Sequence, residues 1–181
     1  MDPNHFKVLA AAALASTVLT ACTANVGGTA QASSASATSP SDVSNPLKNL
    51  PPCTTLDQVV TGRGFAPAVP TIADAQHSCR VTKKTQGDVE GVDISLSLRD
   101  GQSYKANIQN PSQASAGTVG SRAAVEEAEP LGSTGQCEVS IEVKPKSRAT
   151  VGVTFSSDTD KACKLVESLA DKLEPLLPKN T

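Results

Sequence analysis

The sequence predicts an α+β domain with an antiparallel sheet of about five strands and helices packed on one face. Three observations carry this prediction. Apolar and polar residues alternate in several short segments, which is typical of strands buried on one side. One C-terminal segment instead repeats its apolar residues every three or four positions, as an amphipathic helix does. Four cysteines in the same region predict two disulfides that join these layers.

The first predicted helix covers residues 54–60 and begins at a threonine cap. Cys53, Leu56 and Val60 share one side of this helix, so we expect the cysteine to point toward the sheet. The following Gly62-Arg63-Gly64 lacks the lysine and the spacing of a phosphate-binding loop. We interpret it as the end of the helix and a turn.

The middle of the domain predicts a hairpin and a second short helix. Residues 92–98 alternate between apolar and polar side chains, and Asp100-Gly101 then gives a strong signal for a tight turn. A return strand is predicted over residues 104–108, where Tyr104, Ala106 and Ile108 continue the alternation. Residues 121–129 are predicted to form a short helix that ends before Pro130.

The C-terminal third predicts two strands and the longest helix. Residues 137–144 alternate strictly, residues 145–147 turn the chain, and residues 150–155 form the next strand. Pro175 ends the helix that follows. Three side chains are candidates for its N-terminal cap: Ser156, Ser157 and Asp158. Its apolar stripe consists of Ala162, Leu165, Val166, Leu169, Ala170 and Leu173.

Four cysteines allow three disulfide connectivities, and spacing and periodicity favour one of them. Cys53 and Cys79 are 26 positions apart, as are Cys137 and Cys163. Cys79 shares its strand phase with an apolar residue, Cys137 lies on the apolar face of its strand, and Cys163 lies beside the helix stripe. We therefore predict the bridges Cys53–Cys79 and Cys137–Cys163. Zinc binding is the alternative, but there is no CxxC pair and little histidine, so no metal site is predicted.

The N-terminus predicts export and lipidation. Residues 1–21 have the polar start and uncharged run of a signal peptide, and that run is shorter than the about 20 residues that span a bilayer. Leu19-Thr20-Ala21-Cys22 resembles the lipobox of bacterial lipoproteins. We expect cleavage before Cys22 and attachment of acyl chains such as palmitate to it. The protein would then be anchored at the extracytoplasmic face of the cell membrane. The alternative is an ordinary secretory signal with a chance cysteine.

The remaining segments frame a single domain at residues 52–178. Residues 22–51 begin with the lipidated cysteine and are rich in Ser, Ala, Thr and Pro, which predicts a flexible tether. This tether is interpreted as a spacer, with an O-glycosylated stalk as the alternative. Residues 179–181 are a short tail.

The order of these motifs resembles the actinobacterial lipoproteins grouped as domain of unknown function 3558. The likeness rests on the lipobox, the tether, and a set of positions spread over the domain. Members often have Trp after the second cysteine, where this chain has Arg80. The resemblance implies an actinobacterial cell envelope, and it implies no functional residues because the family has no established activity. The matching positions are Pro52, Cys53, Leu56, Cys79, Cys137, Asp160, Cys163, Leu177 and Pro178.

Composition argues against two functional classes. The chain has 18 acidic and 16 basic residues, a net charge of -2 and no Trp, which does not fit a nucleic-acid binder. His77 is the one histidine beyond the predicted signal peptide, and no Gly-x-Ser-x-Gly motif occurs, so a Ser-His-Asp hydrolase is not indicated. His77 is interpreted as solvated.

Two charged clusters are interpreted as solvated faces. Glu126, Glu127 and Glu129 form the acidic one, for which calcium binding is the alternative. The basic one is on a predicted hairpin turn, where contact with anionic lipid or wall polymer is the alternative. It consists of Lys144, Lys146 and Arg148.

These observations predict a non-catalytic binding or accessory module of the bacterial cell envelope, without a cofactor. Besides the membrane, expected partners are an envelope protein or a small apolar ligand, and no nucleic acid. One alternative is a structural or surface-exposed lipoprotein without a specific ligand, and another is an enzyme of unrecognised chemistry. A pocket above about 300 Å³ between helix and sheet would favour ligand binding, and a solid core would favour protein contact or a structural role. A cleft with converging titratable groups would favour the enzyme.

Overall fold

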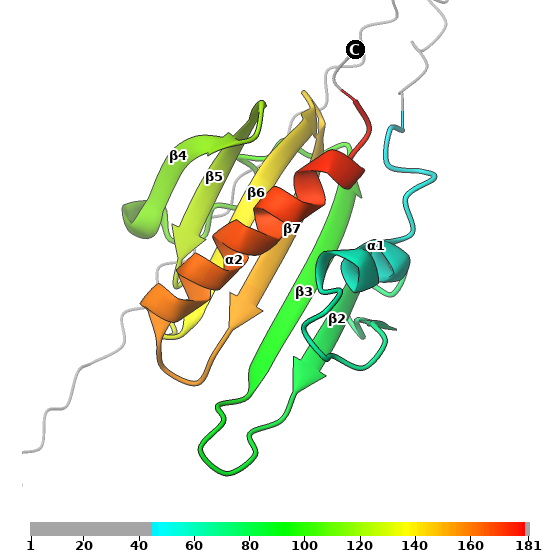
Figure 1. The fold of residues 1–181 in the computed structure, drawn as a ribbon. Coiled ribbons are helices and arrows are strands. Elements are labelled where there is room, and N and C mark those ends of the chain that lie inside the picture. Colours follow the sequence, from blue (N-terminus) through cyan, green and yellow to red (C-terminus); the bar gives the residue numbers. More distant parts are fainter. Residues whose placement is uncertain (1–44, 180–181) are drawn as a thin grey trace, which may run out of the picture. The chain divides into compact units, whose positions relative to one another are not determined.

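The computed structural model describes residues 45–179, which belong to one compact unit, residues 42–181. A single antiparallel sheet with the strand order β1-β2-β3-β7-β6-β5-β4 runs through it (Figure 1). The described sheet has seven strands where the sequence predicted about five. They are β1 (Val69–Pro70), β2 (Ser78–Lys83), β3 (Val92–Asp100), β4 (Ala114–Val119), β5 (Arg122–Ala128), β6 (Gln136–Lys144) and β7 (Ser147–Thr154).

Both helices lie on the same face of the sheet, as predicted. Helix α1 (Pro52–Val59) lies over β2 and β3, and α2 (Thr159–Leu173) crosses β6 and β7 (Figure 1). Asp158 caps α2 by accepting a hydrogen bond of 2.9 Å from the backbone N–H of Lys161. A 3-10 turn, η2 (Glu174–Leu176), follows α2 at the predicted proline.

The predicted threonine cap of α1 is wrong. The helix begins at Pro52, and Pro51 at the N-cap position makes no side-chain cap. Thr55 instead donates its hydroxyl proton back to the carbonyl of Pro51 at 2.8 Å. Proline suits the first helical position because its missing N–H would have no partner there and its φ is already helical.

A filled apolar layer separates the helices from the sheet. Along β3 and β6 every second side chain is buried, as the alternation predicted. The helix stripe packs against these residues, and burial of each large aliphatic side chain contributes about 1.5–3 kcal/mol. The largest side chains that are fully buried include Leu56, Ile94, Leu96, Ile141, Val151, Val166, Leu169 and Leu173.

Two disulfides join the helices to the sheet across this layer. Cys53 of α1 is bonded to Cys79 of β2, and Cys137 of β6 is bonded to Cys163 of α2. In each bridge the two Cα atoms are 5.0 Å apart. This is the connectivity that spacing and strand phase favour.

The predicted return strand at residues 104–108 does not form. Gly101 only bends the chain, with a φ of +81°, and the predicted hairpin is absent because β3 already pairs with β2 on one edge and with β7 on the other. No edge of β3 is therefore free for a third partner. Residues 101–110, here called the strap, instead pass over the sheet face opposite the helices, before the 3-10 turn η1 (Pro111–Gln113).

The helix predicted at residues 121–129 is also wrong. These residues form β5, which pairs with β4 on one side and with β6 on the other. Gly120, with a φ of +56°, makes the tight turn that joins β4 to β5. Alanine and glutamate favour a helix locally, but pairing with two strands overrides that preference.

The predicted signal peptide (residues 1–21) and Cys22 lie outside the described residues, as does the predicted tether up to residue 44. Among residues 45–179, no helix is both long enough and apolar enough to cross a bilayer.

Candidate functional site

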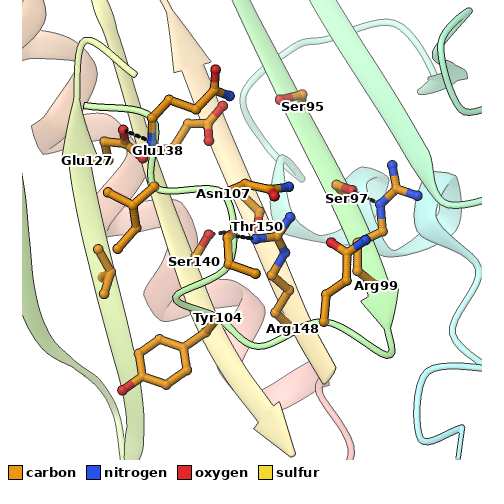
Figure 2. Close-up of a pocket in the computed structure, with 15 residues that line it drawn as sticks. Ser95, Ser97, Arg99, Tyr104, Asn107, Glu127, Glu138, Ser140, Arg148 and Thr150 are labelled. Carbon is orange, nitrogen blue, oxygen red and sulfur yellow. Dashed lines mark hydrogen bonds between the residues drawn. The ribbon is translucent and has the colours of Figure 1, made fainter. Parts of the chain in front are cut away.

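The strap and the polar face of the sheet enclose a pocket of about 270 Å³ (Figure 2). Its floor comes from β3, β7, β6 and β5, and its roof comes from the strap. Sequence analysis did not predict it, because the roof was assigned to a strand and one wall to a helix. The lining residues are Ser95, Ser97, Arg99, Gln102, Tyr104, Ala106, Asn107, Ile108, Gln109, Val125, Glu127, Glu138, Ser140, Arg148 and Thr150.

Strand register arranges the floor in three rows. Arg99 pairs with Arg148 in the first row. The middle row holds hydroxyl groups, and the side-chain oxygens of Ser140 and Thr150 are hydrogen-bonded at 2.8 Å. Successive rows are two residues apart along the strands, which is about 7 Å. The middle row consists of Ser97, Thr150, Ser140 and Val125, and the third of Ser95, Gly152, Glu138 and Glu127.

A glycine keeps the third row open. A Cβ atom at Gly152 would lie 2.9 Å from the hydroxyl oxygen of Ser95 and 3.4 Å from Cγ of Glu138. A larger residue would therefore fill the space between these two side chains. Glycine weakens a strand interior, so this position is typical of a place where other groups approach the backbone closely.

Arg148 is a buried cation with an incomplete set of partners. Only 8% of the residue is exposed. Its Nη1 group donates to the carbonyl of Ala106 in the strap, whereas its Nε is buried without a hydrogen-bond partner. Burial lowers the pKa of Arg148, the nearby charge of Arg99 lowers it further, and Glu138 opposes both effects.

The other arginine of the first row already has partners. Nη2 of Arg99 lies 2.5 Å from Oδ2 of Asp74, and its Nε donates to the hydroxyl of Ser97 at 3.2 Å. Arg148 is therefore the arginine of this row with a buried donor left unpaired. Glu142 lies across from it on β6 in the strand register, but among the described residues no ion pair joins the two.

Glu127 fastens the strap to the sheet. Only 6% of Glu127 is exposed. Its Oε1 accepts a hydrogen bond of 2.7 Å from the backbone N–H of Gln109 and another from the backbone N–H of Asn110. The side-chain amide of Asn110 also donates to the carbonyl of Glu129 at 3.2 Å. These bonds hold one end of the roof in place.

Glu138 lies directly across from Glu127 in the strand register. Burial raises the pKa of the Glu138 carboxyl, the charge of Glu127 raises it further, and Arg148 opposes the shift. Like charges in directly opposed positions destabilise a sheet. The third row thus contains two carboxyl groups whose mutual repulsion is only partly offset by the charge of Arg148 on the neighbouring strand β7.

In each of the two charged clusters predicted to be solvated, the fold buries at least one member. Glu127 and Arg148 are buried in the pocket, so the solvated interpretation is wrong for both. Lys146 lies exposed in the turn between β6 and β7, as predicted. The sequence did contain a signal for this polar face. The residues of β3, β6 and β7 that alternate with the buried apolar ones include both hydroxyl and charged side chains.

His77 lies away from the pocket, at its own ion pair. Its side chain is 51% exposed, and its Nδ1 is 2.9 Å from Oδ1 of Asp74. The hydrogen bond from His77 is the main cause that lowers the pKa of Asp74; burial opposes it, and the charge of Arg99 assists. Within residues 45–179, the hydrogen bonds of the His77 ring include no serine or cysteine nucleophile.

A second hollow, of about 340 Å³, lies at the sheet edge between β4, β5 and α2. It contains Glu126, Glu167 and Asp171, and burial followed by the charge of Glu167 raises the pKa of Glu126. Ligand atoms of Glu126, Cys137 and Cys163 lie within 4.8 Å of one another. Both sulfurs are in a disulfide, so they offer no thiolate to a metal.

The model of one protein family matches residues 17–176 of the chain. That family is described as "Protein of unknown function (DUF3558)", and the match spans most of the 181 residues. The chain therefore belongs to this family, as its cysteine and proline positions indicated. Comparison with curated proteins and with solved structures gives no match.

Proposed function

We propose that this member of the DUF3558 family is a membrane-anchored extracytoplasmic lipoprotein of the cell envelope, acting as a non-catalytic binding module for a small polar ligand. The observation that carries the proposal is the strap-covered pocket, in whose lining the buried Nε of Arg148 and the amide oxygen of Gln102 have no hydrogen-bond partner. Buried polar groups in proteins are nearly always satisfied. An unsatisfied buried group therefore calls for an explanation, and a bound ligand that completes its hydrogen bonds is the one proposed here.

The location rests on the sequence. Leu19-Thr20-Ala21-Cys22 ends a short uncharged run and supplies the thiol for lipidation. Two or more acyl chains give stable anchoring. The residues after Cys22 would serve as the spacer between anchor and domain, and the last residues of the predicted tether, including the buried Leu47, pack on the domain.

The character of the pocket favours a polar ligand over the small apolar ligand expected at first. Its lining is dominated by hydroxyl, amide, carboxyl and guanidinium groups. The layer between the helices and the centre of the sheet is filled by side chains such as Ile141, Val151 and Leu169. An apolar ligand would leave the polar groups of the pocket unpaired at a cost of about 1–3 kcal/mol each.

Two features support binding over catalysis. The hydroxyls of Ser140 and Thr150 are bonded to each other and not to a base. His77 is paired with Asp74 and does not line the pocket. A nucleophile–base pair within hydrogen-bonding reach, which covalent catalysis requires, is therefore not assembled in this pocket.

Metabolic labelling with an alkyne analogue of palmitate tests the anchor in a bacterial host that exports the full chain. Wild type and the neighbouring control Thr23→Ala are expected to take up label and to fractionate with membranes. Cys22→Ala is expected to take up none. Labelling of Cys22→Ala to the wild-type level would contradict the lipoprotein assignment.

Thermal unfolding of the full chain against a panel of small polar metabolites tests the binding role. A ligand at 100 times its Kd is expected to stabilise the fold by about 2.7 kcal/mol. Thr150→Val, on the pocket floor, should lose this stabilisation, and Ser115→Ala, in the hollow beside β4, should keep it. A structural lipoprotein without a ligand would be stabilised by no compound, and an enzyme would consume one.

A further inference from the structure

The floor of the pocket carries two like-charged pairs of opposite sign. Arg99 and Arg148 are directly opposed on β3 and β7, and Glu127 and Glu138 are directly opposed on β5 and β6. Each arrangement is unfavourable by itself, because like charges facing each other across strands repel. The first is partly relieved by Asp74, which pairs with Arg99, and by Glu142, which lies across from Arg148 on β6 in the strand register.

The two pairs lie at opposite ends of the pocket in the strand register, and the attraction between Arg148 and Glu138 offsets only part of the repulsion in each pair. Four residues along β7, or about 13 Å, separate the row of Arg148 from the row of Glu138. Among the described residues, no ion pair joins Arg148 to Glu138 or to Glu127. Between the two ends lie hydroxyl groups and the hydrogen-bonded Ser140 and Thr150 (Figure 2).

From this arrangement we propose that the pocket binds a small zwitterion of the amino-acid class, with its carboxylate on Arg148 and its ammonium group at Glu138 and Glu127. This inference rests on the proposed function and names the ligand class of the same pocket. The pocket volume of about 270 Å³ is just below that of pockets that bind drug-sized ligands, so it fits a molecule as small as an amino acid.

The carboxylate end follows from the free edge of the guanidinium. Nη1 of Arg148 is used by the carbonyl of Ala106, and Nε has no partner. The Nε and Nη2 groups form the side edge of the guanidinium, and such an edge receives both oxygens of a carboxylate in two parallel hydrogen bonds. The bond from Nη1 to the strap thus leaves the buried Nε as the unpaired donor of Arg148, and a carboxylate that enters beside it would complete its hydrogen bonds.

The ammonium end follows from the facing carboxyl groups. A cation between Glu127 and Glu138 turns a repulsive pair into an attractive one. It also stabilises the ionised form of Glu138, whose pKa is raised in the empty pocket by burial and by Glu127. A neutral sugar would leave both charged ends uncompensated, and an anion without an ammonium group would add to the negative charge at this end.

Calorimetry on the full chain in an uncharged detergent tests the ligand class. The probes are glycine, 4-aminobutanoate and 6-aminohexanoate, with hexanoate, hexylamine and glucose as matched comparisons. At least one zwitterion is expected to bind, and at least tenfold more tightly than hexanoate or hexylamine. Glucose binding more tightly than every zwitterion, or no zwitterion binding at millimolar concentration, would overturn the proposal.

Charge-removing variants assign the two ends. Arg148→Gln should abolish the preference for the zwitterion over hexylamine, and Glu138→Gln should abolish the preference over hexanoate. Lys146→Gln, in the exposed turn, should bind as wild type does. Equal weakening by all three variants would overturn the assignment. If a variant does not fold, the comparison of probes on the wild-type chain still decides.

The outcomes separate this inference from the binding role. If glucose binds and Thr150→Val abolishes its binding, the pocket is a ligand site but the zwitterion proposal is wrong. If no compound of the panel stabilises the wild-type chain, both the zwitterion proposal and the binding role are wrong.

Discussion

The two faces of the sheet, one covered by the helices and the other by the strap, differ in composition, packing and hydrogen bonding. Under α1 and α2 the side chains are aliphatic, fully buried and closely packed, and two disulfides cross the layer. Under the strap the side chains are hydroxyls, carboxyls and guanidinium groups, and part of their hydrogen-bonding capacity is unused. The comparison suggests that one face supplies most of the stability and the other is available for binding.

Neighbouring residues of β6 give the largest expected contrast between the faces. Ile141 is completely buried under the helices, so Ile141→Ala should lower the free energy of unfolding by about 4 kcal/mol through lost burial and a cavity. Ser140 points to the pocket, and Ser140→Ala should cost about 1 kcal/mol, the value of one hydrogen bond. Denaturant unfolding of both variants measures this contrast. Equal losses would remove the distinction between the faces.

The two disulfides test how the helix-covered face is stabilised. Both close loops of 26 residues, so each is expected to contribute about 3.5 kcal/mol by restricting the unfolded chain. Cys53→Ala with Cys79→Ala, and Cys137→Ala with Cys163→Ala, should therefore destabilise the fold by similar amounts. A difference of more than about 2 kcal/mol in denaturant unfolding would show that loop closure is not the main contribution.

On the polar face, Glu127→Ala should loosen the strap. The carboxylate accepts two backbone hydrogen bonds from Gln109 and Asn110, and bonds to a charged group contribute about 1.5–3 kcal/mol each. Amide hydrogen exchange at these two residues should accelerate, while exchange in the centre of β6 and β7 should not change. Unchanged exchange at Gln109 and Asn110 would mean that other contacts hold the strap.

The smallest expected effect is a gain in stability. Because the pKa of Glu138 is raised in the fold, its stabilising contribution is complete below the usual pKa of 4.5 and is lost as the pH rises through the folded pKa. Glu127 and Arg148 are the charged groups that act on it. Glu138→Gln should thus be more stable than wild type at pH 7, by about 0.5 kcal/mol, the scale of a like-charge contact across strands.

Thermal unfolding of wild type and Glu138→Gln from below pH 4.5 to pH 7 checks the sign of this stability difference. The difference should vanish below pH 4.5. A variant that is less stable than wild type at pH 7 would show that the Glu138 charge is favourably paired.

The helix-covered face was largely predictable from the sequence because periodicity records burial. Strict alternation located β3 and β6, and the stripe from Ala162 to Leu173 located α2. The cysteine phases gave both bridges. In these segments the local pattern and the tertiary environment agree.

The strap-covered face was not predictable by the same means. Residues 121–129 have a composition that favours a helix, and only pairing with β4 and β6 makes them a strand. Gly101 does bend the chain, but the sequence does not reveal that both edges of β3 are occupied. Since the pocket combines this strand with the strap, its residues could not be brought together before the topology was known.

Hydrogen exchange of the full chain, measured with and without a saturating zwitterion such as 6-aminohexanoate, tests the central claim most directly. The claim is that the polar face, and not the helix-covered face, is the binding surface. Slower exchange is predicted in the strap, residues 101–110, with little change in the centre of α2, whose apolar stripe is already buried. Protection confined to α2 and the hollow beside β4, or protection nowhere, would contradict it.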